Sequence, residues 1–188
     1  NTPSTILTGE TFYNLEIRKT YVGITGVQLN DSIAVVNNFS VLQGTFEMNP
    51  ASRLYVGNQL SISAGAGLNA NDGDVKIYVA GNWNDANTTT TTTTGFNCGL
   101  YSIVYFLGKP ASIQTITEPC PFNHVVVRGS GTYVRPHGID MNCRNLTLES
   151  GTFRLFNYTV TVTETATVGG GILRMDNAND SLIVQDIV

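Results

Sequence analysis

The sequence has little charge, few cysteines and no long apolar run, and each shortage excludes a class of protein. Only 13% of its 188 residues are Asp, Glu, Lys or Arg. This is about half the usual share and argues against coiled coils, helical bundles and charged disordered tails. The formal net charge is -4, and the 10 Lys and Arg residues form no cluster along the chain, so nucleic acids are not expected as partners. No segment approaches the roughly 18 continuous apolar residues of a membrane span.

Short segments in which apolar and polar residues alternate are abundant, and they predict β-strands along the whole chain. They lie at residues 39–41, 54–56, 60–62, 75–79, 103–105, 125–127, 146–148 and 158–162. Segments rich in Gly, Asn and Asp, such as 71–74 and 169–171, separate them. These residue types favour sharp corners. We therefore expect an all-β protein of short strands.

The spacing of the apolar residues predicts how the strands are arranged. Three sets of apolar residues recur at intervals of 21 positions: Val35, Val56 and Ile77; Val41, Ile62 and Trp83; Met141, Val162 and Ile183. A fixed step of this kind is typical of a solenoid, in which equivalent residues of successive coils stack about 4.8 Å apart in parallel sheets. We predict a right-handed parallel β-helix (β-solenoid) of about 21 residues per coil, with these nine residues as inward columns.

A longer repeat, about 107 positions in length, overlies the short one. Residues 12–17 match 122–127, and residues 39–46 match 146–153. The two copies cover approximately residues 4–110 and 114–188, and the chain stops inside the second. We therefore interpret residues 1–188 as a single solenoid segment of a longer protein.

Five short motifs point to a family. They are residues 12–17, 44–46 (Gly-Thr-Phe), 81–83 (Gly-Asn-Trp), 104–108 and 158–162. In this order they resemble the repeat regions of very large secreted and cell-surface proteins of the Bacteroidota. The resemblance implies a β-helix, export by the type IX secretion route, an adhesin-like role and no active-site motif.

This resemblance leads us to expect a non-catalytic structural or adhesive module: an extracellular stalk, filament or adhesin. Its partners would be an extracellular surface or polysaccharide, or other copies and proteins of a surface assembly. The alternatives are a carbohydrate-active β-helix enzyme and a carbohydrate-binding domain. An enzyme would need clustered carboxylates or a basic residue beside them, for which the candidates are Asp74, Asp85, Asp140 and Arg144. A binding domain would show a row of exposed aromatic residues, for which the candidates are Tyr13, Tyr21, Tyr78 and Tyr101.

Two acidic segments could hold calcium, which prefers oxygen ligands. They contain Asp72, Asp74, Asp176 and Asp180. Tight corners select the same residue types, so a purely structural role stays open. No other cofactor is expected.

The three cysteines, Cys98, Cys120 and Cys143, are 22 and 23 positions apart, close to one coil. Residues stacked on neighbouring coils lie within the Cα separation of a disulfide. One bridge, Cys98–Cys120 or Cys120–Cys143, could form in an oxidising compartment, and buried free thiols are the alternative. No Cys-x-x-Cys pair is present, so zinc is not expected.

Ser32 and Ser181 each lie between an aspartate and an aliphatic residue. These triplets resemble the O-glycosylation acceptor of the Bacteroidota, and the alternative is a serine at a turn before a strand. The seven consecutive threonines at 88–94 interrupt the spacing and are interpreted as a structural spacer. His124 occupies the place of Asn14 in the earlier repeat, which predicts an exposed strand position.

Overall fold

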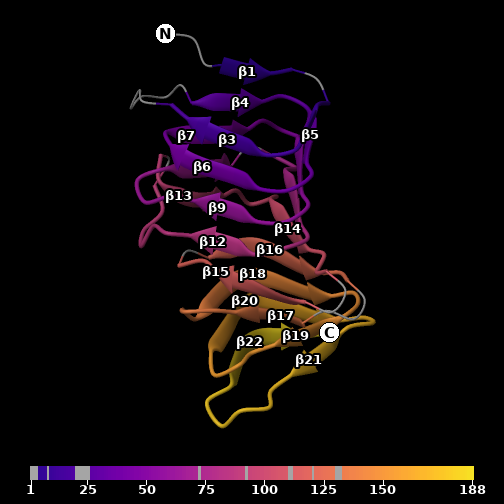
Figure 1. Ribbon diagram of the computed structural model, residues 1–188. Coiled ribbons are helices and arrows are strands. Elements are labelled where there is room, and N and C mark those ends of the chain that lie inside the picture. The colour runs from indigo at the N-terminus through magenta and orange to yellow at the C-terminus, as the bar shows by residue number, and fades with distance from the viewer. Residues whose placement is uncertain are drawn as a thin grey trace.

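The computed structural model (Figure 1) describes residues 4–7, 9–19, 26–71, 73–91, 93–109, 112–119, 121–129 and 133–188. This part of the chain contains strands and no helix, so no helix in it is long and apolar enough to cross a membrane. The chain winds as a parallel β-solenoid of about eight coils with roughly 21 residues per coil. The predicted fold class is therefore confirmed.

The strands form three sheets, A, B and C, in which every neighbouring pair is parallel. Sheet A contains β1 (Ser4–Ile6), β4 (Val27–Leu29), β7 (Thr45–Met48), β10 (Gly67–Ala70) and β13 (Gly95–Cys98). Sheet B contains β2 (Thr11–Phe12), β5 (Ser32–Val35), β8 (Arg53–Val56), β11 (Lys76–Val79), β14 (Ile103–Phe106), β16 (Phe122–Val127), β18 (Met141–Leu148), β20 (Thr159–Val168) and β22 (Ser181–Ile187). Sheet C contains β3 (Leu15–Arg18), β6 (Phe39–Gln43), β9 (Leu60–Ile62), β12 (Trp83–Asp85), β15 (Ile113–Thr117), β17 (Tyr133–Pro136), β19 (Thr152–Arg154) and β21 (Ile172–Arg174).

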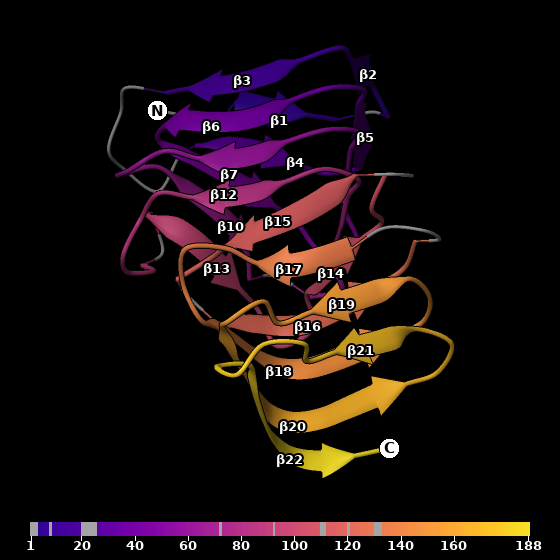
Figure 2. The same ribbon diagram turned by 60° about the horizontal axis from the view of Figure 1, so that its bottom comes forward.

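The first coils visit sheets A, B and C in turn, whereas the coils after β13 alternate between B and C. Only residues 118–121 join β15 to β16, and Pro119 and Pro121 have no N–H to add to a ladder. Figure 2 shows β15, β17, β19 and β21 on one side of these later coils and β16, β18, β20 and β22 on the other. The sheet B strands lengthen to 8 residues in β18 and 10 in β20.

The core is a continuous column of inward side chains that runs along the solenoid. In many strands every second residue is buried, as in β5, β8 and β11, because successive side chains point to opposite faces of a sheet. Where sheet A ends, the interior is filled by aromatic rings. Trp83 packs edge-on against Phe96, Phe106 and Phe122, with ring centroids 4.8 to 6.2 Å apart, and its indole N–H donates to the buried Glu118 carboxylate at 2.9 Å.

The first two predicted columns are correct for one step and wrong for the next. Val35 pairs with Val56 as predicted. Val56 then pairs with Val79, 23 positions on, and Ile77 lies beside Leu54 instead. Since strands have a period of two residues, two extra residues in the corners leave every side chain on its predicted face. Ile77 is therefore buried, but in the neighbouring column.

The same shift affects the second predicted column. Val41 pairs with Ile62 as predicted, but Ile62 pairs with Asp85, and Trp83 lies beside Leu60. All three apolar residues of this column are nevertheless buried.

The third predicted column contains an error of face. Met141 pairs with Val160, and Val162 pairs with Cys143 and Val184. A one-residue difference in coil length reverses the direction of a side chain, so Ile183 points outward and is 56% exposed.

The two copies of the longer sequence repeat do not occupy equivalent places in the fold, because matching segments lie in different sheets. Phe12 lies in sheet B and residues 15–18 in sheet C, whereas their partners at 122–127 form one strand of sheet B. Residues 39–43 likewise lie in sheet C and 146–148 in sheet B.

Candidate functional site

Outward side chains at the same position of successive coils form a column, in which neighbouring residues are about 4.8 Å apart. In this protein many neighbours within a column are joined by hydrogen bonds. On sheet A, Gln28 and Asn69 both donate to the Glu47 carboxylate at 3.2 Å, and Asn97 donates to Asn69 at 3.1 Å. On sheet C, the hydroxyls of Ser40 and Ser61 lie 2.8 Å apart. The outer surface therefore repeats from coil to coil, as the core does.

The tyrosine column on sheet B consists of Tyr55, Tyr78 and Tyr105. Their rings are stacked nearly parallel, with centroids 4.6 and 4.5 Å apart and planes 9° and 10° apart. The guanidinium of Arg128 caps the column 5.1 Å from the Tyr105 centroid and forms an ion pair with Glu149. Burial, together with the neighbouring Tyr78, raises the pKa of Tyr105. The hydrogen bond from Arg128 lowers the pKa of Glu149.

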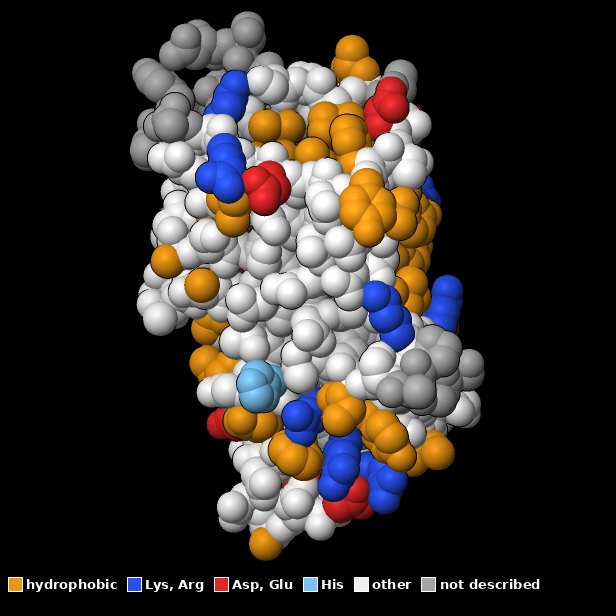
Figure 3. Space-filling view, in the orientation of Figure 1, with side chains coloured by type: hydrophobic (Ala, Val, Ile, Leu, Met, Phe, Trp, Pro, Cys, Tyr) orange, Lys and Arg blue, Asp and Glu red, His pale blue; other side chains and the backbone are white. Residues whose placement is uncertain are grey.

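An apolar groove of about 250 Å³ runs beside the tyrosine column. The small residues Gly57 and Ala80 line it, together with Val36 and Leu107. Figure 3 shows hydrophobic side chains along the right-hand edge of the molecule, where Figure 1 places β5 and β14. The tyrosine faces are largely occupied by one another, so this surface presents mainly ring edges and aliphatic groups.

The arginine column on sheet C consists of Arg135, Arg154 and Arg174. The registers of β17 with β19 and of β19 with β21 place these three residues side by side on successive coils. Arg154 and Arg174 share one carboxylate, that of Asp176, at 3.2 and 3.1 Å. In Figure 3 basic side chains gather among hydrophobic ones in the lower part of the view, over these strands.

Phe156 packs against this column from a strained backbone. Its ring centroid lies 3.9 Å from the guanidinium carbon of Arg135 and 5.1 Å from that of Arg154. Phe156 and Asn157 both have positive φ, 55° and 68°, which costs about 1 to 3 kcal/mol for each non-glycine residue. Asn157 N–H donates to Asp180 at 2.5 Å, which helps to hold this corner.

Asp180 organises the same corner through its carboxylate. It accepts backbone N–H groups from Asn157 and Asn177. Partial desolvation acts to raise its pKa, but these hydrogen bonds outweigh that effect and lower the pKa.

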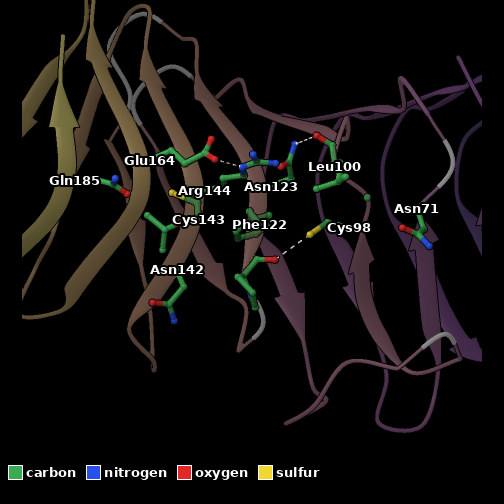
Figure 4. A pocket seen from close by; sticks show the side chains of 13 residues that line it. Asn71, Cys98, Leu100, Phe122, Asn123, Asn142, Cys143, Arg144, Glu164 and Gln185 are labelled. Atoms are coloured by element: carbon green, nitrogen blue, oxygen red, sulfur yellow. Dashed lines mark hydrogen bonds and ion pairs between the residues drawn. The ribbon is translucent and has the colours of Figure 1, made fainter.

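A pocket of about 440 Å³ lies where sheet A ends, beside β13, β16, β18 and β20 (Figure 4). Arg144 and Glu164 meet in it as an ion pair 2.5 Å long, and the hydrogen bond from Arg144 lowers the pKa of Glu164. Cys143 also lines the pocket, and burial raises the pKa of its thiol to about 12, which leaves it protonated and weakly nucleophilic at neutral pH. Glu164 is the one Asp or Glu among the described residues that line this pocket, whereas a glycosidase uses a pair of carboxyl groups.

The four residues considered for catalysis have separate partners. Asp74 pairs with Lys76 at 3.1 Å, and Asp140 accepts the N–H of Thr159 at 2.8 Å. Asp85 is buried at the end of β12, and its carboxylate accepts the N–H of Phe96 at 2.8 Å. Only Arg144 lines the large pocket.

The calcium candidates do not gather in the described part of the chain, where no three His, Cys, Asp or Glu residues form a metal-sized group. Asp72 lies outside the described residues. The carboxylates of Asp74, Asp176 and Asp180 already have partners: the first two form ion pairs with basic side chains, and the third accepts backbone N–H groups.

Two of the three cysteines are described, and Cys120 lies outside the described residues. The Cys98 thiol lies 3.1 Å from the Pro121 carbonyl oxygen, and Cys143 is buried beside Phe122. Both predicted bridges involve Cys120, so the disulfide stays a prediction.

The two serines of the glycosylation motif share one structural position. Ser32 and Ser181 each begin a sheet B strand, β5 and β22, and both are half-buried. The Asp31 carboxylate accepts the Ser32 N–H at 2.7 Å, as expected for a serine at a turn before a strand. Their modification stays a prediction.

His124 differs from its predicted environment. It lies in β16 beside Ile103 and Asn145, is only partly exposed, and has its ring Nε2 2.9 Å from the Thr147 hydroxyl. Burial lowers its pKa.

An aromatic row lies on the outer face, but it has a different membership from the one predicted and is mostly half-buried: Tyr55 is 40% exposed, whereas Tyr78 and Tyr105 are half-buried. Tyr78 belongs to it, Tyr13 and Tyr101 are 70% and 68% exposed elsewhere, and Tyr21 lies outside the described residues. Tyr78 follows Tyr55 by 23 positions, and Tyr105 follows Tyr78 by 27 positions. A search at a fixed step of 21 therefore misses this row.

The arginine column was missed for the same reason. Arg135, Arg154 and Arg174 are 19 and 20 positions apart, and this recurrence at almost one coil is the sequence signal by which the column could have been found.

No family model, curated protein or solved structure matches this chain.

Proposed function

We propose that the protein is a non-catalytic structural and adhesive module of a secreted or cell-surface protein, exported by the type IX route. The location and the route rest on the motif resemblance, and the adhesive role rests on the outer surface. The observation that supports it most is the pair of ordered columns, tyrosine on sheet B and arginine on sheet C. Their side chains are fixed by stacking and packing, which lowers the entropy lost on binding a partner.

The continuous core suits such a role. Each coil packs on its neighbours through parallel ladders and buried apolar residues, so the solenoid holds its outer columns at constant spacing. A repetitive partner, such as a polysaccharide or a second surface protein, meets the same kind of contact on several coils and gains avidity from them.

Adhesion and turnover can be measured together. Microspheres coated with the purified protein should stay attached, under flow, to surfaces carrying extracellular polysaccharides or the protein itself. The same polysaccharides, incubated with soluble protein, should release no new reducing ends and no unsaturated sugars. Sugar release that scales with protein concentration would overturn the proposal in favour of an enzyme. If the microspheres attached to none of these surfaces, the adhesive role would be overturned.

A further inference from the structure

We infer that the arginine column binds an acidic polysaccharide that carries a carboxylate on each sugar. This inference rests on the proposed function and names the chemical class of partner for one face. The site is Arg135, Arg154 and Arg174 on β17, β19 and β21, together with Phe156.

The charge at this site is unbalanced, unlike that around three of the other four arginines; the fourth, Arg53, donates to the Ala51 carbonyl oxygen at 3.2 Å. Arg18, Arg128 and Arg144 each pair with one glutamate. The arginine column has three positive charges and the single carboxylate of Asp176, which two of the arginines share. Arg135 forms no ion pair with any described carboxylate. In a protein of net charge -4, this local excess of positive charge attracts an anion.

The guanidiniums are held in place although they repel one another. Phe156 packs on Arg135 and Arg154. A planar guanidinium is attracted to the face of an aromatic ring, so this contact stabilises both arginines. The Nε of Arg135 is buried with no hydrogen-bond acceptor in the described part of the chain, and the Nε of Arg154 is near Asp176 without the alignment of a hydrogen bond. Donors left unsatisfied in this way are rare in proteins, and a bidentate carboxylate is the ligand that the guanidinium fork fits best.

The surroundings suit a sugar chain. The neighbouring outward column contains Tyr133, Thr152 and Ile172, and Tyr133 and Ile172 are 40% and 58% exposed. An aromatic ring and an aliphatic side chain can cover the apolar face of a sugar while the hydroxyl of threonine bonds to its edge. A polymer that lies along the solenoid axis meets one guanidinium on each coil, about 4.8 Å apart.

A polyuronate fits this surface better than a nucleic acid does. Nucleic acids carry dense charge and select long basic tracts, whereas here three arginines lie on an acidic protein. A neutral glycan would leave the charge excess unmatched.

The test uses the whole chain and polygalacturonate, with electrophoretic retardation as the readout. Polygalacturonate should retard the protein, and neutral dextran should not. The double variant Arg135→Gln/Arg174→Gln should bind about tenfold or more weakly, since two charge-assisted contacts are lost. The matched control is the double variant Arg18→Gln/Arg53→Gln, which removes the same charge outside both columns and should change affinity less than about twofold. Raising salt from about 50 to about 300 mM should weaken binding.

A second arm leaves the protein unchanged, in case the double variant fails to fold. Methyl esterification of polygalacturonate removes the carboxylate charge and should abolish retardation. Equal binding of the esterified polymer, or an equal loss of affinity with Arg18→Gln/Arg53→Gln, would overturn the inference. Tighter binding of dextran sulfate or of single-stranded oligonucleotide would overturn the assignment to carboxylates or to polysaccharide. If coated microspheres attach to other surfaces but polygalacturonate does not retard the protein, this inference fails and the proposed function stands.

Discussion

The tyrosine column of sheet B and the arginine column of sheet C have the same geometry and opposite consequences. Each repeats one residue type on three successive coils of the solenoid. Tyrosine rings attract one another when stacked, so Tyr55, Tyr78 and Tyr105 mostly satisfy themselves. Guanidiniums repel one another, so the arginine column needs Phe156 and Asp176. A column of neutral rings stabilises the fold by itself, whereas a column of like charges keeps an excess of positive charge that an anionic partner can neutralise.

The largest expected effect comes from the inward neighbour of the tyrosine column. Val56→Asp buries a charge without a partner beside Val35 and Val79, which costs several kcal/mol. We expect loss of the cooperative thermal transition measured by circular dichroism. The control is Tyr55→Asp, one residue away on the outer face and 40% exposed in the wild type, which should still unfold cooperatively. An unchanged melting temperature for Val56→Asp would contradict the inward assignment.

The next effect concerns the support of the arginine column. Phe156→Ala removes the ring over Arg135 and Arg154 and keeps a side chain at φ 55°. We expect a loss of about 1 to 3 kcal/mol in the free energy of unfolding, measured in urea. Phe156→Gly loses the same ring but relieves the strain, since glycine adopts positive φ readily, and should be about 1 kcal/mol more stable than Phe156→Ala. If the alanine variant were the more stable of the two, the strain would not be real.

A smaller effect separates the middle of the tyrosine column from its end. Tyr78→Ala removes two stacking contacts and Tyr55→Ala removes one. With about 0.5 to 1.5 kcal/mol for each aromatic pair, the loss of unfolding free energy should be about twice as large for Tyr78→Ala. Equal losses for the two variants would mean that the rings do not act as a column.

The smallest effect depends on pH and involves the cap of the tyrosine column. Arg128 lowers the pKa of Glu149 in the folded protein, so this pair stabilises the fold above the pKa of an unfolded glutamate. The stabilisation is lost as the pH falls through the lower, folded pKa. Because the pair lies at the surface, its contribution is at most about 1 kcal/mol. The stability difference between wild type and Glu149→Gln should therefore shrink between about pH 5 and about pH 3. A difference that grew in acid would have the wrong sign.

The fold could be predicted because the period of a strand tolerates errors of two residues. Counting in steps of 21 placed Ile77 and Trp83 inside the solenoid although their coil is longer than that step. The same count failed for Ile183, where the difference is one residue and the side chain changes face. The end of sheet A after β13 depends on the short connection at residues 118–121, which no periodicity reveals.

The candidate site was harder to predict because outer columns carry no requirement for apolar residues. The arginines at 135, 154 and 174 lie on coils that are shorter than the step of 21, and Phe156 reaches them only through two positive φ angles. Arg144 was identified as a candidate, but its partner Glu164 comes from the next coil and becomes visible once β18 pairs with β20.

The most direct test of the column register is the set of nuclear Overhauser effects among tyrosine ring protons in solution. The structure predicts strong effects between Tyr55 and Tyr78 and between Tyr78 and Tyr105, whose centroids are 4.6 and 4.5 Å apart. No effect is expected between Tyr55 and Tyr105, the two ends of the column. Effects that instead join Tyr55 to Lys76, as a uniform step of 21 positions requires, would contradict the register and both outer columns derived from it.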